Sequence, residues 1–141
     1  MKVNAYLNYG GNCLEAFRFY EKNIGAKIGM YMTYGQSPDQ SVVTPQNKDF
    51  VLYASLTIGE STIMGSDVDP QRFQPMRSVY LCLSAESSSE AERLYNLLAD
   101  GGQVYMEMAE TFFATRFGQL RDKFGTSWMI IHEKPMGPPQ S

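Results

Sequence analysis

Residues 15–20 read Glu-Ala-Phe-Arg-Phe-Tyr, and residues 90–95 read Glu-Ala-Glu-Arg-Leu-Tyr. Both stretches lie in segments whose apolar side chains recur at helical spacing and which end at glycine. Two further pairs of stretches repeat in the same order: 25–28 with 101–104, and 58–61 with 124–127. Three ordered matches indicate an internal duplication, so the two halves of the chain are predicted to share one topology.

Each half is predicted to contain four strands and one helix, which makes the fold class α+β, with two βαβββ modules and a mixed β-sheet. Strands are expected at 3–9, 27–34, 50–58, 61–65, 78–84, 103–108, 114–122 and 126–131. One helix follows Asn12, and the other follows Ser87, each with a glutamate placed to form a capping box. The polar, proline-containing stretches 35–49 and 66–76 are expected to be loops, the first of them mobile.

We expect a single domain over residues 1–141, with module one at about 1–67, module two at about 77–133 and a Pro-rich tail at 134–141. The alternative is a single α+β sandwich in which two amphipathic helices resemble each other by chance.

The composition excludes several classes of protein. The chain has 141 residues, 43% of them hydrophobic, and a net charge of −3, so it can bury a core and has no basic excess for nucleic acid. No signal peptide or membrane-length apolar stretch is visible, which favours the cytoplasm and no membrane partner. Cys13 and Cys82 are both expected on buried faces, as free thiols.

His132 is the only histidine in the chain, so a zinc site with several histidines cannot be built. The residue is either a general base, because its ordinary pKa lies near neutrality, or an exposed residue at a strand end beside Glu133 and Lys134.

The duplicated pattern resembles the vicinal-oxygen-chelate superfamily, which contains glyoxalase I, bleomycin-resistance proteins and extradiol dioxygenases, and within it the PhnB-like branch. The resemblance covers about residues 3 to 131 and rests on several motifs. These are residues 6–8 (Tyr-Leu-Asn), 11–13 (Gly-Asn-Cys), 15–20, 56–59 (Leu-Thr-Ile-Gly), 64–67 (Met-Gly-Ser-Asp), 110–114 (Glu-Thr-Phe-Phe-Ala), 116–118 (Arg-Phe-Gly), Asp122, 124–125 (Phe-Gly) and Trp128.

This resemblance implies that each module curls into a half-cup, that two half-cups enclose a pocket, and that the protein is a homodimer, with or without exchanged modules. In metal-using members four strands supply one ligand each. Here those positions fall near Ala5 or Tyr6, at Tyr53, at Ser78 or Val79, and near Met129. At least three of the four expected ligands are absent, so no metal and no other cofactor is predicted, with a divalent metal as the alternative.

Six residues are expected to line a small-molecule pocket, because aromatic walls with a few polar groups are typical of such sites. They are Tyr6, Asn8, Tyr53, Phe112, Phe113 and Trp128. The alternative is a packed interior, above all for Trp128.

Glu110 and Arg116 are the candidate catalytic residues, because both belong to the motif-rich segment 110–118. A raised pKa would suit Glu110 to acid–base catalysis, and Arg116 could hold an anionic ligand or pair with Glu110. A structural ion pair explains the two equally well.

Three functions therefore stay open. The first is a metal-independent binding protein for an unidentified small molecule, and the second is a metal-dependent lyase or isomerase. The third is a metal-free enzyme that uses Glu110 and Arg116. Some members of the branch carry a name that implies ubiquinone methyl transfer. The turn at Gly10-Gly11 lacks the glycine spacing that cradles a nucleotide cofactor, so methyl transfer is not expected.

Overall fold

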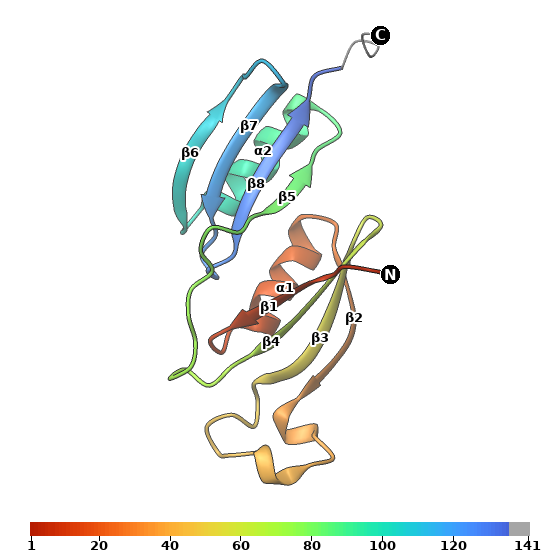
Figure 1. Ribbon diagram of the computed structural model, residues 1–141, viewed down its shortest axis with the longest axis vertical. Helices are drawn as coiled ribbons and strands as arrows, with labels where there is room; N and C mark the ends of the chain where they lie inside the picture. Colours follow the sequence, from red (N-terminus) through yellow and green to blue (C-terminus); the bar gives the residue numbers. More distant parts are fainter. Residues whose placement is uncertain (136–141) are drawn as a thin grey trace. The chain divides into compact units, whose positions relative to one another are not determined.

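The computed structural model describes residues 1–135 and divides the chain into two compact units (Figure 1). The division falls between Gln74 and Pro75, within the stretch predicted to connect the two modules. Each unit contains four strands and one α-helix. The single domain and the pairing of two chains into a dimer stay predictions.

The first unit has the order β1, α1, β2, β3, β4, with two short 3-10 helices between β2 and β3. The elements span β1 Ala5–Tyr9, α1 Cys13–Asn23, β2 Lys27–Thr33, η1 Tyr34–Gln36, η2 Gln40–Val42, β3 Val51–Ile58 and β4 Ser61–Asp67. The strands lie in the order β1-β4-β3-β2. β1 is parallel to β4, whereas β3 is antiparallel to both of its neighbours.

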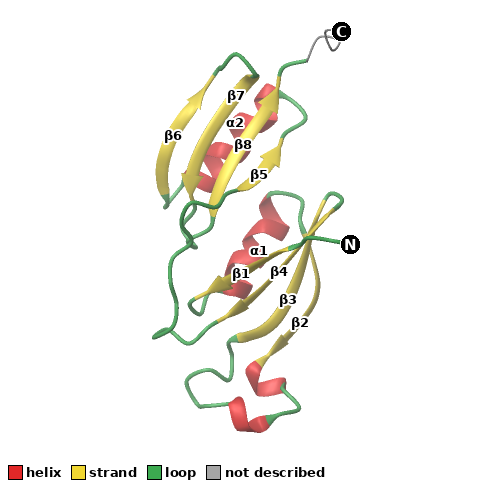
Figure 2. Ribbon diagram, in the orientation of Figure 1, coloured by secondary structure: helices red, strands yellow, loops and turns green. Residues whose placement is uncertain are grey.

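The second unit repeats this topology. Its elements span β5 Leu81–Ser84, α2 Ser88–Ala99, β6 Gln103–Ala109, β7 Ala114–Arg121 and β8 Ser127–Glu133. The strand order is β5-β8-β7-β6, with β5 parallel to β8 and β7 antiparallel to both neighbours. In each unit the helix covers one face of the sheet and leaves the other face open (Figure 2). The α+β class and the two βαβββ modules are confirmed.

The core of the first unit lies between α1 and its sheet. Phe17 of α1 is fully buried, and its ring packs edge-on against that of Tyr9 of β1. A Cβ at Gly65 would lie 2.8 Å from the Phe17 ring, so only glycine lets the helix approach β4 this closely. Burial of one such aromatic side chain contributes about 1.5–3 kcal/mol.

In the core of the second unit, a glycine again lets the helix pack closely against a strand. A Cβ at Gly118 of β7 would lie 2.8 Å from the ring of Tyr95 of α2. Trp128 of β8 is 1% exposed, and its Nε1 donates a hydrogen bond of 2.8 Å to the buried carboxylate of Asp122. The indole is therefore part of this core, with its one polar atom satisfied.

The strand expected at 78–84 is shorter than predicted, because it begins at Leu81. Ser78 has a φ of 58°, a left-handed conformation that a strand does not contain, and Val79 is 66% exposed. The alternation of apolar residues therefore predicted a strand where the backbone turns instead.

The capping box predicted at the start of α1 does not form. The one predicted at α2 makes only one of its two hydrogen bonds. Asn12 makes no side-chain cap hydrogen bond at the start of α1. At α2, Ser87 Oγ accepts from the Glu90 N–H at 3.1 Å, but the Glu90 carboxylate binds Arg93 at 2.6 Å instead of returning to Ser87. The ion pair between Glu90 and Arg93 thus takes the carboxylate that the second hydrogen bond of the capping box would need.

The two cysteines are free thiols in different environments. Cys13 is fully buried, as predicted, and burial, with a smaller effect from Asp67, raises its pKa to about 12. Cys82 is exposed, so the expectation of a buried face was wrong for this residue. β5 is the outer strand of its sheet, which explains the accessibility of Cys82.

A thiol-specific reagent at pH 8 is expected to label one cysteine per native chain and two in denaturant. Cys82 is reachable, whereas Cys13 is both enclosed and protonated. The measurement is the absorbance of the released chromophore over time. Cys82→Ser should abolish the native reaction, and rapid labelling of two thiols in the native protein would contradict the burial of Cys13.

Candidate functional site

The open face of the first sheet carries two of the residues predicted to bind a ligand. Leu7 and Tyr9 are buried toward α1, so the alternating residues Tyr6 and Asn8 point to the open face. Tyr6 is 47% exposed. The Asn8 side-chain oxygen accepts a hydrogen bond of 3.3 Å from Ser66 Oγ on the neighbouring strand.

The carboxylate of Asp67 joins three separate segments at one end of this sheet. Its Oδ1 accepts hydrogen bonds from the backbone N–H groups of Gly11 and Cys13, at 2.9 and 3.0 Å. Its Oδ2 accepts from the N–H of Val51 at 2.9 Å. Asp67 is 2% exposed, so these bonds replace the water that the carboxylate loses. They fix the turn before α1 and the start of β3 against the end of β4.

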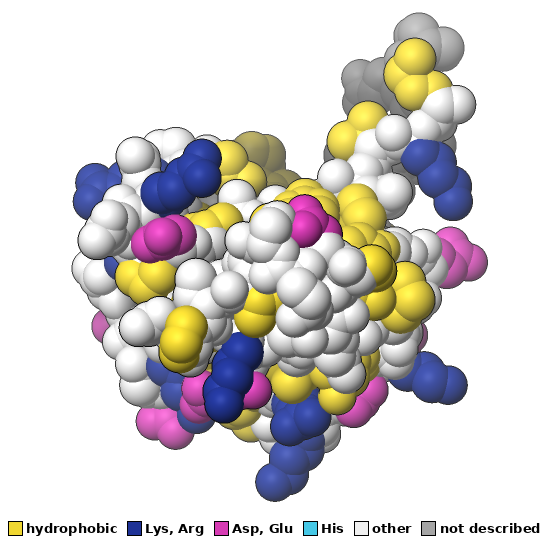
Figure 3. All heavy atoms as spheres, turned by 90° about the horizontal axis from the view of Figure 1, so that it is seen from below, with side chains coloured by type: hydrophobic (Ala, Val, Ile, Leu, Met, Phe, Trp, Pro, Cys, Tyr) yellow, Lys and Arg dark blue, Asp and Glu magenta, His cyan; other side chains and the backbone are white. Residues whose placement is uncertain are grey.

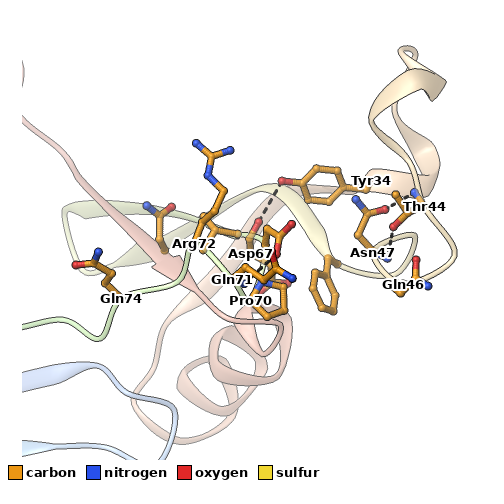
Figure 4. A pocket seen from close by; sticks show the side chains of 13 residues that line it. Tyr34, Thr44, Gln46, Asn47, Asp67, Pro70, Gln71, Arg72 and Gln74 are labelled. Carbon is orange, nitrogen blue, oxygen red and sulfur yellow. Dashed lines mark hydrogen bonds between the residues drawn. The ribbon is translucent and has the colours of Figure 1, made fainter.

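A pocket of about 890 Å³ opens beside Asp67 (Figure 4). One wall is the segment 34–50, which contains η1 and η2, and another is the segment 67–74. The Tyr34 hydroxyl donates to the Asp67 carbonyl oxygen at 3.1 Å and so ties the first wall to the end of β4. The lining consists of Asn8, Tyr34, Thr44, Gln46, Asn47, Phe50, Asp67, Val68, Asp69, Pro70, Gln71, Arg72 and Gln74.

Several polar groups that line this pocket are not used by the fold. Within residues 1–135, no side-chain hydrogen bond joins Gln46, Gln71 or Gln74 to the chain, and Arg72 is in no ion pair. Their amide and guanidinium groups can donate and accept hydrogen bonds from different sides of the cavity. Aromatic surface comes from Tyr34 and Phe50. A small molecule with several polar groups suits this lining.

The surface around the segment 34–50 carries no concentration of one charge. Figure 3 views the molecule from the end where this segment lies, and shows hydrophobic, basic and acidic side chains interspersed among the backbone and uncharged polar side chains. Such a surface offers no basic stripe of the kind that follows a phosphate backbone.

Of the residues predicted to bind a ligand, Asn8 lines this pocket, and the prediction did not include its other lining residues. The remaining lining residues lie in, or next to, stretches 35–49 and 66–76, which were expected to be simple loops. The first of these contains two 3-10 turns held by local bonds, such as that from Gln40 Nε2 to the Ser37 carbonyl at 2.6 Å. The available signal was the length of an insertion rich in amide side chains, since a long ordered loop is often functional.

The other predicted ligand-binding residues lie apart from the pocket. Tyr53 is half-buried on β3 and is not among the lining residues. Phe112 is 92% exposed, and its ring packs edge-on against Phe113, which in turn contacts Phe117 of β7. Trp128 lies in the core of the second unit. Their roles in ligand binding stay predictions.

Glu110 and Arg116 do not pair with each other. Glu110 binds Lys134 at 2.9 Å, and this hydrogen bond and charge lower the pKa of the exposed Glu110 carboxyl. The expected raised pKa was therefore wrong. Arg116 Nε donates to Glu92 of α2 at 2.7 Å. Because Glu92 lies on α2, this bond places the Arg116 side chain on the face that α2 covers and not on the open face.

His132 is half-buried and hydrogen-bonded, not an exposed residue at a strand end. Its Nδ1 lies 2.5 Å from Thr115 Oγ1, and the same hydroxyl accepts a hydrogen bond of 2.8 Å from Ser88. This connection joins β7, β8 and the first turn of α2, which gives His132 a structural role.

The positions that hold metal in the related superfamily do not fit a divalent cation here. At the ligand position in the first strand, Tyr6 points its phenol to the open face. At the ligand position in the last strand, the side chain is the thioether of Met129. Phenols and thioethers are poor ligands for hard divalent cations. Over residues 1–135, no three His, Cys, Asp or Glu side chains come together where they could hold a metal ion.

Comparison with known proteins places the chain in a family. A family model described as 3-demethylubiquinone-9 3-methyltransferase matches residues 1–131. The chain belongs to this family. Protein YjdN of Escherichia coli (strain K12) is 32% identical over 138 residues, which are 92% of this chain and 94% of that protein.

Solved structures are similar to this chain over nearly its whole length. Protein PA1353 from Pseudomonas aeruginosa is 34% identical, with a TM-score of 0.87 over 96% of this chain and 99% of the other. The PhnB protein from Bacillus cereus is 23% identical, with a TM-score of 0.79 over 94% and 99% of the two chains. A glyoxylase/bleomycin resistance protein/dioxygenase domain from Frankia sp. EAN1pec is 16% identical and reaches 0.62 over 95% and 98%. The resemblance to the PhnB-like branch is confirmed.

Neither α1 nor α2, the two α-helices in the described part of the chain, has the length and the apolar character needed to cross a bilayer.

Asp67→Asn is expected to lower the free energy of unfolding by roughly 2–4 kcal/mol, because an amide cannot accept all three backbone hydrogen bonds and adds a buried donor. The measurement is urea unfolding followed by circular dichroism, because the single tryptophan, Trp128, lies in the second unit. Asp49→Asn, an exposed carboxylate in the same unit, is the matched control and should change stability by less than about 0.5 kcal/mol. Equal stability of the two variants would contradict the role assigned to Asp67.

Proposed function

We propose that this protein binds a small polar molecule in the pocket beside Asp67. The observation that supports this most directly is the set of unpaired amide and guanidinium groups, from Gln46, Gln71, Arg72 and Gln74, around a cavity of about 890 Å³. Cavities of this size suit small-molecule ligands, and unpaired polar groups give such sites their specificity. The hydrogen bonds of Asp67 shape the pocket before any ligand arrives, which lowers the entropic cost of binding.

Binding without catalysis is favoured over the metal-free enzyme. Glu110 is exposed and its pKa is lowered by Lys134, so it is a weak acid–base catalyst near neutral pH. Arg116 is held by Glu92 on the helix-covered face. Neither residue lines the pocket.

Methyl transfer, which the family description names, is not supported by the turn before α1. A nucleotide-like cofactor is commonly held by free N–H groups at such a glycine-containing turn. Here the N–H groups of Gly11 and Cys13 are bound to Asp67, whose negative charge also disfavours an anionic cofactor there. The side chains of the pocket therefore carry the proposal, and the family name does not.

A thermal-shift screen of small polar metabolites is expected to give ligands whose binding depends on the pocket amides. Gln71→Ala and Gln46→Ala should each weaken a hit by about 0.5–1.5 kcal/mol, or roughly 2- to 12-fold, in isothermal titration calorimetry. Glu60→Gln is the matched control, because Glu60 lies in the β3–β4 turn at the opposite end of the sheet from Val51 and Asp67. Hits that bind both alanine variants and this control equally would place the ligand elsewhere.

Elemental analysis of the dialysed protein is expected to find no stoichiometric metal, and added nickel, zinc, manganese or iron(II) should leave the melting temperature unchanged. The reason is the donor set, in which phenol and thioether groups stand at the family's ligand positions. A shift of several degrees at micromolar metal would overturn this expectation and support the metal-dependent lyase or isomerase.

A further inference from the structure

Arg121 is a charged side chain of the second unit that lacks an adequate partner. It is the last residue of β7 and is half-buried. Its Nη2 donates to the Met76 carbonyl oxygen over a long 3.4 Å, and its Nε is buried with no hydrogen-bond partner. Within residues 1–135, Arg121 forms no ion pair with any carboxylate.

An arginine in this state is costly to the folded protein. A guanidinium stays charged at any physiological pH, and a buried donor without an acceptor loses its bonds to water and gains nothing in return. Such groups are rare in native proteins and often mark a site for a missing water or ion.

The unsatisfied atoms of Arg121 have the geometry of an oxyanion site. Nε–H and one N–H of Nη2 form one edge of the guanidinium, the arrangement that holds two oxygens of a carboxylate or a phosphate. Nε of this edge is unpaired, and Nη2 has only its weak bond to Met76. An anion with two oxygens would satisfy both atoms at once.

The neighbouring residues place this edge on the open face of the second sheet. Leu120 is fully buried toward α2, and Asp122 is 3% exposed, with its carboxylate bound to Trp128 and to backbone N–H groups. Arg121 lies between them and points to the other side of the sheet. The register sets Gln103 and Ser127 beside it on the adjacent strands, and both can add hydrogen bonds to an anion.

The segment that contains Met76 bonds to the Arg121 side chain through a long hydrogen bond to the Met76 carbonyl. Met76 precedes Ser78, whose φ of 58° is unfavourable for a residue with a side chain. A hydrogen bond of 3.4 Å is longer than the usual range and therefore weak, so its loss costs little when an anion takes its place.

We propose that Arg121 binds an oxyanion, a carboxylate or a phosphate group, on the open face of the second sheet, where the anion replaces the Met76 carbonyl. The site belongs to the second unit and shares no residue with the pocket beside Asp67.

The test compares the full-length wild type with Arg121→Met in chloride buffer and after addition of phosphate or acetate at constant ionic strength. The wild type should gain about 3 °C or more in melting temperature at saturating anion, with heat of binding in calorimetry. Arg121→Met, which removes the unpaired donor but keeps the length of the side chain, should melt no lower than the wild type in chloride and should lose the response. A purely structural Arg121 predicts the reverse: a lower melting temperature for the variant and no response of the wild type.

Two further variants keep the proposal falsifiable. Arg18→Gln removes one exposed positive charge from α1 and should leave the anion response intact, which separates a site from a general salt effect. Arg121→Lys keeps the charge but not the two-donor edge and should bind at least tenfold more weakly. Equal responses of Arg121→Lys and the wild type would overturn the bidentate site. A response to phosphate alone or to acetate alone identifies the group that the site takes.

Discussion

The first unit depends on the buried carboxylate of Asp67. Its hydrogen bonds reach Gly11 and Cys13, 56 and 54 positions earlier in the chain, and Val51, 16 positions earlier. The end of β4, the turn before α1 and the start of β3 are thereby fixed at one point. Since segment 34–50 ends where β3 begins, the same carboxylate also sets the position of the pocket wall. Fold and candidate site share this one constraint.

The second unit also contains a buried carboxylate, that of Asp122. Asp122 binds the N–H groups of Phe124 and Thr126 and the indole of Trp128, all within six residues. It stabilises a tight turn between β7 and β8. The two modules therefore share a topology but carry their buried carboxylates at different places, Asp67 at the end of β4 and Asp122 directly after β7. This is why the repeat predicts the fold of both units and the site of neither.

The limits of prediction from the sequence follow from the same contrast. Helical and strand periodicities are local, so the paired motifs at 15–20 and 90–95 were sufficient for the topology and for most elements. Local signals failed where a distant group took over, as at Asn12, where Asp67 from the end of β4 binds the neighbouring N–H groups. Trp128 gave no sign in the sequence of whether it faces a ligand or a core, because that depends on its bond to Asp122. The pocket was missed because segment 34–50 has no periodicity to interpret.

The distribution of paired and unpaired charges says where function should be sought. Arg93, Arg116 and Lys134 have carboxylate partners at 2.6 to 2.9 Å, but these pairs are largely exposed and contribute little to stability. The closeness of the two charged side chains is enough to explain why each of these ion pairs forms. Arg121 differs, since the fold buries its Nε and still leaves that atom without a partner. A chain selected for stability alone would replace such a group with an apolar side chain, so its presence is better explained by a ligand that completes it. The amide and guanidinium groups of the pocket are exposed and differ from the ion pairs in another way, because they line a cavity without binding the chain.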